Sequence, residues 1–181
     1  MKPIFKTIVF TLLIAVALVS CKDESSIENY FVDHQDKPEF LTIDFAPDML
    51  DISEVDFSED QKKIYKSYDK VNALAFKVTE NNKEEYKAEL KKAIAIFKND
   101  KYEELIEFTD SGINFRVNTL GEADTVDEFL VLASTSELGF ALIRVLGDDM
   151  QPEKLYELIF KIQKTDVYGN QLQKVMDYLK E

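Results

Sequence analysis

Apolar and polar residues alternate with a period of two along several short segments, which is the pattern of half-buried β-strands. In residues 40–45, for example, Leu41, Ile43 and Phe45 fall on one face and polar residues fall on the other. Turn-forming residues bound most of these segments, as expected for short strands in a compact domain. The same reasoning predicts strands at residues 74–78, 113–117, 128–134 and 139–146.

Residues 101–108 are open to two interpretations. Tyr102, Ile106 and Phe108 lie at alternate positions, as in a strand, whereas the neighbouring glutamates would also suit one turn of helix. We predict a strand, and the turn residues at 110–112 then lead into the next one. The successive strands indicate an antiparallel meander. We expect the chain to leave the sheet at residues 147–149.

A helical period is clearest in residues 83–98, whose apolar stripe contains Tyr86, Ala93 and Phe97. Four shorter helices are predicted from capping residues and apolar spacing. The first follows Ser25 or Ser26, runs through His34 and ends before Pro38. The second starts at a capping box of Ser58 and Gln61 and buries Ile64, Tyr65 and Tyr68. The third has Pro152 in its first turn and carries Leu155, Leu158, Ile159 and Ile162, and the last carries Leu172, Val175, Met176 and Leu179.

These elements predict an α+β fold, in which a mostly antiparallel sheet of about five to six strands has helices packed mainly on one face. Pro47 and the pair Met49-Leu50 are expected to form a turn packed by its apolar residues. The length of residues 27–181 suits one such domain.

The N-terminal residues have the pattern of a secretory signal peptide: Lys2 and Lys6 precede an apolar stretch at residues 8–19. The run Leu18-Val19-Ser20-Cys21 resembles the lipobox of bacterial lipoproteins, in which the peptide is cut before an acylated cysteine. We therefore expect a signal peptide at residues 1–20, a tether at 21–26 and palmitate or a similar acyl chain on Cys21. An uncleaved membrane helix, which needs about 20 apolar residues, and a secreted protein with a chance cysteine are the alternatives.

The residues after the lipobox, Lys22-Asp23-Glu24, resemble the export tag that carries some Bacteroidota lipoproteins to the cell surface. An ordinary hydrophilic tether is the alternative interpretation. The expected location is therefore the outer membrane of the cell envelope, on its periplasmic face or at the cell surface.

Charge restricts the partners. The chain has 22 Lys and Arg against 35 Asp and Glu, a formal net charge of −13, which becomes −15 without Lys2 and Lys6. Such an acidic surface repels phosphate backbones and anionic headgroups, so we expect no nucleic-acid binding and no membrane contact except through the lipid. Cys21 is the only cysteine, so no disulfide is expected.

Four short motifs together resemble a Bacteroidota lipoprotein family catalogued as domain of unknown function 4252. They are residues 43–50, the Tyr-Glu-Glu-Leu segment 102–105, the segment 128–132 and the Arg-Val-Leu-Gly-Asp segment 144–148. The resemblance covers residues 27–162. It implies a compact domain and an envelope address, and it implies no activity and no active-site residues.

The search for chemistry yields no catalytic residue, metal site or cofactor. His34 is the only histidine, which argues against histidine-based zinc sites and a Ser-His-acid triad, and we expect it to be solvated at a helix end. Asp148-Asp149 could bind a cation, but we favour a helix-capping role. Glu103, Glu104 and Glu107 are expected on a solvated face of the sheet rather than in a glycosidase-like pair.

Arg116 and Arg144 are the only arginines, and both fall within predicted strands. A face carrying both could bind an anionic ligand or an acidic partner, because the guanidinium fork suits carboxylate and phosphate. We favour cross-strand ion pairs with residues such as Glu104 or Glu128.

Three functions follow, in order of preference. The first is a non-enzymatic interaction or accessory module anchored by Cys21, with an envelope protein as partner. The second is an anion or small-ligand binder that uses Arg116 and Arg144. The third is an envelope hydrolase that uses carboxylates alone, which would need two acids converging in one pocket.

Overall fold

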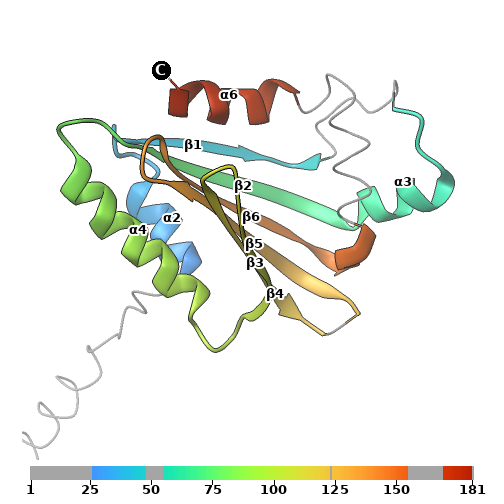
Figure 1. Cartoon of the computed structure of the whole chain (residues 1–181). Helices are drawn as coiled ribbons and strands as arrows, with labels where there is room; N and C mark the ends of the chain where they lie inside the picture. Colours follow the sequence, from blue (N-terminus) through green and yellow to red (C-terminus); the bar gives the residue numbers. More distant parts are fainter. Residues whose placement is uncertain (1–25, 48–54, 123, 155–168, 181) are drawn as a thin grey trace, which may run out of the picture.

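Six strands pair in one fully antiparallel sheet in the order β1-β2-β6-β5-β4-β3 (Figure 1). The computed structural model describes residues 26–47, 55–122, 124–154 and 169–180. Along the chain the elements are α2 (Ile27–His34), β1 (Phe40–Phe45), α3 (Glu59–Lys66), β2 (Tyr68–Lys77), α4 (Lys83–Phe97), β3 (Glu103–Asp110), β4 (Ile113–Gly121), β5 (Val126–Thr135), β6 (Gly139–Met150) and α6 (Gly169–Lys180).

The four strands β3 to β6 form the predicted meander, because each pairs with the next along the chain. β2 then pairs with the free side of β6, and β1 pairs with β2, to which it is connected through α3. Residues 101–108, which were open to two interpretations, contribute the strand β3. The α+β fold with six strands is therefore confirmed.

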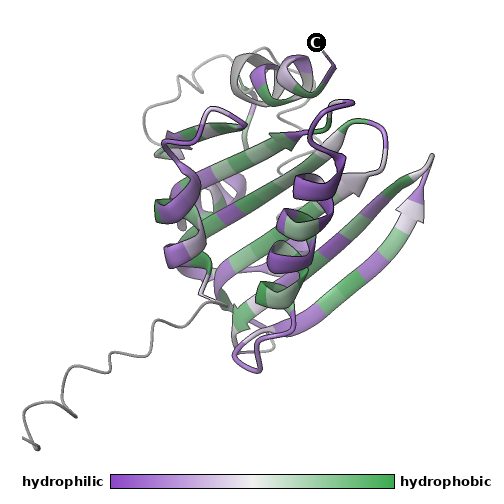
Figure 2. Cartoon of the chain, turned by 90° about the vertical axis from the view of Figure 1, so that its left-hand side faces the viewer, coloured by the Kyte–Doolittle hydropathy of each residue, from purple (hydrophilic) through white to green (hydrophobic). Residues whose placement is uncertain are grey.

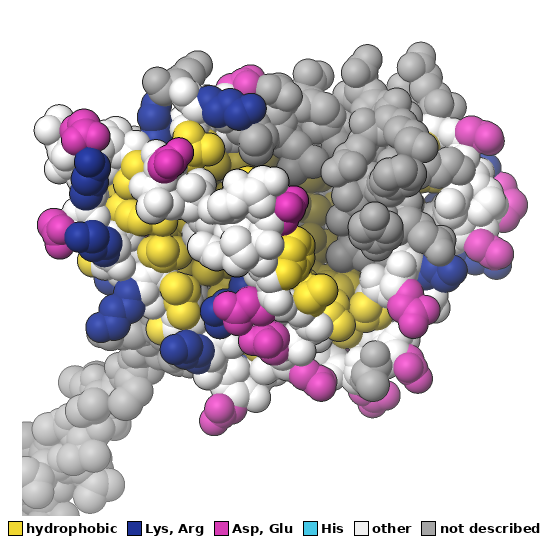
Figure 3. Space-filling model, viewed as in Figure 1, with side chains coloured by type: hydrophobic (Ala, Val, Ile, Leu, Met, Phe, Trp, Pro, Cys, Tyr) yellow, Lys and Arg dark blue, Asp and Glu magenta, His cyan; other side chains and the backbone are white. Residues whose placement is uncertain are grey.

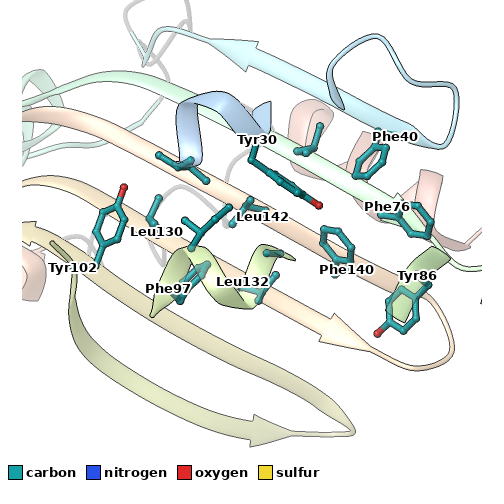
Figure 4. Packing of buried hydrophobic residues seen from close by; sticks show 14 residues of the cluster. Tyr30, Phe40, Phe76, Tyr86, Phe97, Tyr102, Leu130, Leu132, Phe140 and Leu142 are labelled. Carbon is teal, nitrogen blue, oxygen red and sulfur yellow. The ribbon is translucent and has the colours of Figure 1, made fainter. Parts of the chain in front are cut away.

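One face of the sheet carries the main core beneath α2 and α4 (Figure 4). Phe76 and Phe140 from neighbouring strands stack with ring centroids 5.7 Å apart. Phe40 meets the Phe76 ring edge-on at 5.0 Å, an arrangement that aromatic quadrupoles favour. The remaining core residues come from both helices, from β2, β5 and β6, and from the segment before β3; they include Ile27, Leu74, Ala93, Ile96, Tyr102, Leu130, Leu132 and Leu142.

Over β1 and β2, the opposite face is covered by α6, and the core side chains there are smaller than those beneath α2 and α4. Ala73, Ala75 and Ala141 give the helix a surface of small side chains, against which Val175 packs. Tyr178 of α6 donates a hydrogen bond of 2.7 Å to the carbonyl oxygen of Glu39. Tyr65 of α3 also packs on this face, in one cluster with Phe129. The expectation that helices pack mainly on one face therefore describes α2 and α4 but not α3 and α6.

Two predicted helix starts are confirmed. The Ser26 hydroxyl accepts from the backbone N–H of Asn29 at 3.4 Å, so Ser26 and not Ser25 is the N-cap of α2. Ser58 and Gln61 form the predicted capping box at the start of α3, with hydrogen bonds of 3.2 and 3.1 Å. Tyr68, predicted on this helix, instead begins β2, because α3 ends at Lys66.

Strand β6 is longer than predicted. Residues 147–149 do not leave the sheet, since the strand continues to Met150, which faces Val126 of β5 after a register shift. Gly147 permits this path because a side chain there would collide with the carbonyl oxygen of Ser67. Asp149 takes a left-handed φ of 52°, which aspartate tolerates better than most residues.

Some predictions lie outside the described residues, namely the turn at Met49-Leu50 and the helix positions Leu155, Leu158, Ile159 and Ile162. Residues 152–154 are helical, as the position of Pro152 predicts. Within the ranges that the structure describes, no helix is long and apolar enough to cross a membrane. Figure 2 shows apolar and polar residues alternating along the strands, as the sequence pattern predicted.

Candidate functional site

A buried ion pair joins the two central strands on the α2 side of the sheet. The guanidinium group of Arg144 in β6 donates two hydrogen bonds to Glu128 in β5, at 2.8 Å from Nε and 3.2 Å from Nη2. Tyr102 donates its hydroxyl proton to the same carboxylate at 2.9 Å. We call Glu28, Tyr102, Glu128 and Arg144 the Arg144 cluster.

Glu28 connects this cluster to the start of α2. Its carboxylate accepts a hydrogen bond of 2.5 Å from Nη2 of Arg144, 116 positions away in the sequence. The hydroxyl of Ser26, the N-cap of the same helix, donates to the other oxygen of Glu28 at 2.6 Å. One arginine therefore holds two strands and a helix terminus together.

Burial and charge act against each other in this cluster. The side chain of Glu128 is 4 % exposed and that of Arg144 is 14 % exposed. Burial opposes the charge on Arg144, but the hydrogen bonds and negative charges of Glu128 and Glu28 outweigh it and raise its pKa. Burial and the Glu128 charge raise the pKa of Tyr102, which keeps its hydroxyl protonated as a donor.

A second buried cluster fixes the other end of α2 to α4. The Glu89 side chain is 6 % exposed and accepts hydrogen bonds from Tyr30 at 3.1 Å and from Lys92 at 2.8 Å. Nε2 of His34 lies 2.9 Å from the Glu89 carboxylate, at ion-pair distance but without hydrogen-bond alignment. Nδ1 of His34 lies 2.7 Å from the carbonyl oxygen of Tyr30. We call Tyr30, His34, Glu89 and Lys92 the Glu89 cluster.

The expectation that His34 is solvated is wrong, because this residue is 4 % exposed. It does lie at the end of α2, as predicted, but α4 packs beside that end and supplies a carboxylate. A ring centroid distance of 4.7 Å also places His34 against Phe40.

The other arginine, Arg116, lies on the same face of the sheet but at its edge. It faces Leu132, whereas Arg144 faces Leu130 two positions earlier on the same strand. Arg116 pairs across strands with Glu107 at 2.5 Å, a residue that was not among the examples of expected partners. Glu128, which was one of those examples, pairs with Arg144. Carboxylates thus occupy both guanidinium groups, and the structure brings the two arginines to one face without joining them in one site.

The family described as Domain of unknown function (DUF4252) matches residues 30–158, more than half of the chain. The chain belongs to this family. No curated protein and no solved structure matches it.

The DUF4252 match contains most of both clusters. Glu89, Glu128 and Arg144 lie within residues 30–158, whereas Glu28 lies just before them. The contact of Glu28 with Arg144 therefore ties the segment that leads into the DUF4252 domain to its sheet.

Glu28 and Glu128 are two carboxylates that converge, which is the feature a carboxylate hydrolase needs. They converge on a guanidinium group, however, and not on an open space. Burial alone would raise the pKa of Glu28, but the Ser26 hydroxyl, its own backbone N–H, Arg144 and Lys101 together lower it. This pair is therefore arranged for ion pairing rather than for proton transfer.

The remaining predicted site residues are less informative. Asp148 and Asp149 are exposed and belong to β6, so they do not cap the helix that begins at residue 152. In the described ranges, no three His, Cys, Asp or Glu side chains are close enough to hold a metal ion. Glu103, Glu104 and Glu107 are exposed on β3, as predicted. Cys21, Lys22, Asp23 and Glu24 lie outside the described residues.

Sequence reasoning missed Glu28, Tyr30, Glu89 and Tyr102 as members of charged clusters. One signal was present for Glu89, which falls between Tyr86 and Ala93 on the apolar stripe of α4. A carboxylate at such a position needs a buried partner. For Glu28, no local pattern indicates a contact 116 positions away.

Replacing Arg144 is expected to destabilise the domain strongly. Arg144→Ala leaves the buried Glu128 unpaired and should lower the free energy of unfolding by about 3–5 kcal/mol in urea denaturation. Arg116→Ala is the matched control, since its more exposed pair should contribute less than about 1 kcal/mol. The double variant Arg144→Met/Glu128→Leu should be more stable than Arg144→Ala. Equal decreases in the free energy of unfolding for Arg144→Ala and Arg116→Ala would contradict a central role of Arg144.

Acid should weaken the Glu89 cluster. Burial opposes the charge of Glu89, but Lys92, His34 and the Tyr30 hydroxyl outweigh it and lower its pKa below the ordinary value of 4.5. Because the folded pKa lies below the unfolded one, Glu89 stabilises the fold above about pH 4.5, and this contribution is lost as the pH falls through the folded value. Between pH 7 and pH 3, the free energy of unfolding measured by urea denaturation should fall less for Glu89→Gln than for wild type. Glu84→Gln, at an exposed position of the same helix, should follow the wild type.

Proposed function

We propose that this protein is a lipid-anchored envelope protein that acts as a non-enzymatic interaction module. The observation that carries the proposal is the lipobox run Leu18-Val19-Ser20-Cys21, placed five residues before the N-cap Ser26 of α2. A signal peptide of this pattern, cut before Cys21, would leave the acylated residue at the start of the mature chain.

The short tether would keep the domain close to the bilayer. The five residues that follow Cys21 up to Ser26 span at most roughly 18 Å when fully extended. The next helix, α2, is held at its start by Arg144 and at its end by Glu89. A force on the anchor would therefore act on the sheet through two ion-paired contacts rather than unravel α2.

The absence of enzymatic activity is part of the proposal. Arg144 and Glu128 hold each other, and Glu89 is engaged by three side chains, so these buried groups serve packing and orientation. Anion binding by Arg116 and Arg144 is less favoured, because carboxylates already hold both guanidinium groups. Hydrolysis by Glu28 and Glu128 is less favoured, because these two carboxylates converge on Arg144. The acidic surface supports membrane contact through acyl chains alone.

The proposed location is the outer membrane. The triplet Lys22-Asp23-Glu24 is the feature that would direct the domain to the cell surface, and without export it would face the periplasm. In either place, the domain would meet other envelope proteins within the short reach of its tether.

Cys21→Ala is expected to abolish lipid attachment. The variant should not incorporate labelled palmitate, because Cys21 accepts the acyl chain, and it should keep its signal peptide and migrate as a larger chain, because the cut requires the acylated cysteine. Ser25→Ala, which lies outside the lipobox, should remain labelled and membrane-bound. Palmitate labelling of Cys21→Ala at the wild-type level would overturn the anchoring proposal.

A further inference from the structure

Strand β3 ends the sheet, and all eight of its residues are exposed. In the described part of the chain, four large hydrophobic side chains are exposed, and three of them lie on this strand: Leu105, Ile106 and Phe108, at 51 %, 49 % and 45 %. The hairpin of β3 and β4 lies nearest the viewer in Figure 1. In the same view in Figure 3, hydrophobic side chains lie on both sides of this hairpin, and acidic side chains lie below it. Such an edge is unusual, because an exposed apolar edge strand invites pairing with another chain.

The outer half of β3 has the regular geometry that strand addition requires. A bulge lies between Glu104 and Ile106, and from there to Asp110 the strand pairs with β4 without a further register shift. The strand contains no lysine and no proline, the residues that commonly block edges. The backbone groups on its outer side thus form a regular template of about five residues, 106–110.

The two faces of this edge differ in chemistry. On the face away from α4, Phe108 stacks on Phe115 with centroids 4.9 Å apart, and Ile106 lies opposite Val117. On the α4 face, Glu107 pairs with Arg116. A strand added to β3 would therefore meet apolar neighbours on one face and carboxylates on the other.

We propose that β3 binds an extended segment of a partner protein as a seventh strand, and that this segment alternates apolar and basic residues. This inference rests on the proposed function as an interaction module and names the chemistry of its partner. Main-chain hydrogen bonds supply affinity, while the alternation supplies specificity: apolar residues meet Ile106 and Phe108, and lysine or arginine meets Glu107, whose side chain is 46 % exposed beside Arg116. Attraction to an acidic chain of net charge −13 also speeds the encounter.

A second copy of this chain fits the edge poorly. An antiparallel pair of β3 strands that placed Ile106 opposite Phe108 of the second copy would also place Glu107 opposite Glu107. Like charges directly opposite each other destabilise a strand pair, and both strands carry four acidic residues over eight positions. Charge complementarity therefore selects a basic partner.

The test uses the full acylated chain in micelles of an uncharged detergent. The probe is a fluorescent peptide that alternates lysine with valine and phenylalanine, and its binding is measured by fluorescence anisotropy. A peptide with glutamate in place of lysine should bind at least about tenfold more weakly, and raising the salt concentration should weaken the lysine peptide. Equal binding of both peptides would overturn the proposal.

Two variants locate the binding site. Phe108→Lys adds a positive charge to the apolar face of β3 and should reduce the affinity by about tenfold or more. Val32→Lys is the matched control, since Val32 is the other exposed large hydrophobic and lies on α2. Its affinity should equal that of wild type, and equal losses in the two variants would contradict the assignment to β3.

Hydrogen exchange is measured on the wild-type acylated protein, so this test does not depend on how Phe108→Lys folds. Bound peptide should slow exchange of amides in residues 106–110, and an unchanged rate there would overturn the proposal. Slow exchange without peptide, together with a dimeric mass, would overturn it in favour of a second copy. A protein that stays membrane-bound through Cys21 but does not bind the peptide would refute this inference alone and leave the anchoring intact.

Discussion

The contact of Arg144 with Glu128 and Glu28 is the interaction on which the arrangement of this domain depends. Two of its three charged groups come from neighbouring strands in the middle of the sheet, and the third comes from the first turn of the first described helix. A buried carboxylate is costly unless it is paired and hydrogen-bonded, and Glu128 receives both arginine and tyrosine donors. The position of α2 is thereby specified by charge and not by apolar packing alone.

The remaining architecture follows from a sheet that is covered differently on its two faces. Beneath α2 and α4, aromatic rings fill the space and two charged clusters fix the ends of α2. Beneath α6, alanines allow close approach of the helix. At one edge of the sheet, β3 carries exposed apolar side chains and carboxylates, and no described residue pairs with its outer side. The fold is therefore held firmly at the start of α2, and β3 leaves one edge of the sheet open.

Much of this fold could be predicted from the sequence, because alternation and helix caps are local signals. The strands and the Ser58 capping box follow from such signals, and the presence of both arginines within strands made cross-strand ion pairs expected. The errors concern contacts that form only in three dimensions. His34 is buried because α4 supplies Glu89 from 55 positions away, and β6 reaches Met150 through an irregular register that no turn signal reveals.

Hydrogen exchange of the α2 amides under native conditions tests most directly whether the ion-paired clusters fix this helix to the sheet. If they do, the slowest amides of α2 should exchange with the same free energy of opening as those of β6, because both open only in global unfolding. Exchange of all α2 amides through a smaller opening, with β6 still protected, would show that α2 detaches on its own and would contradict the account.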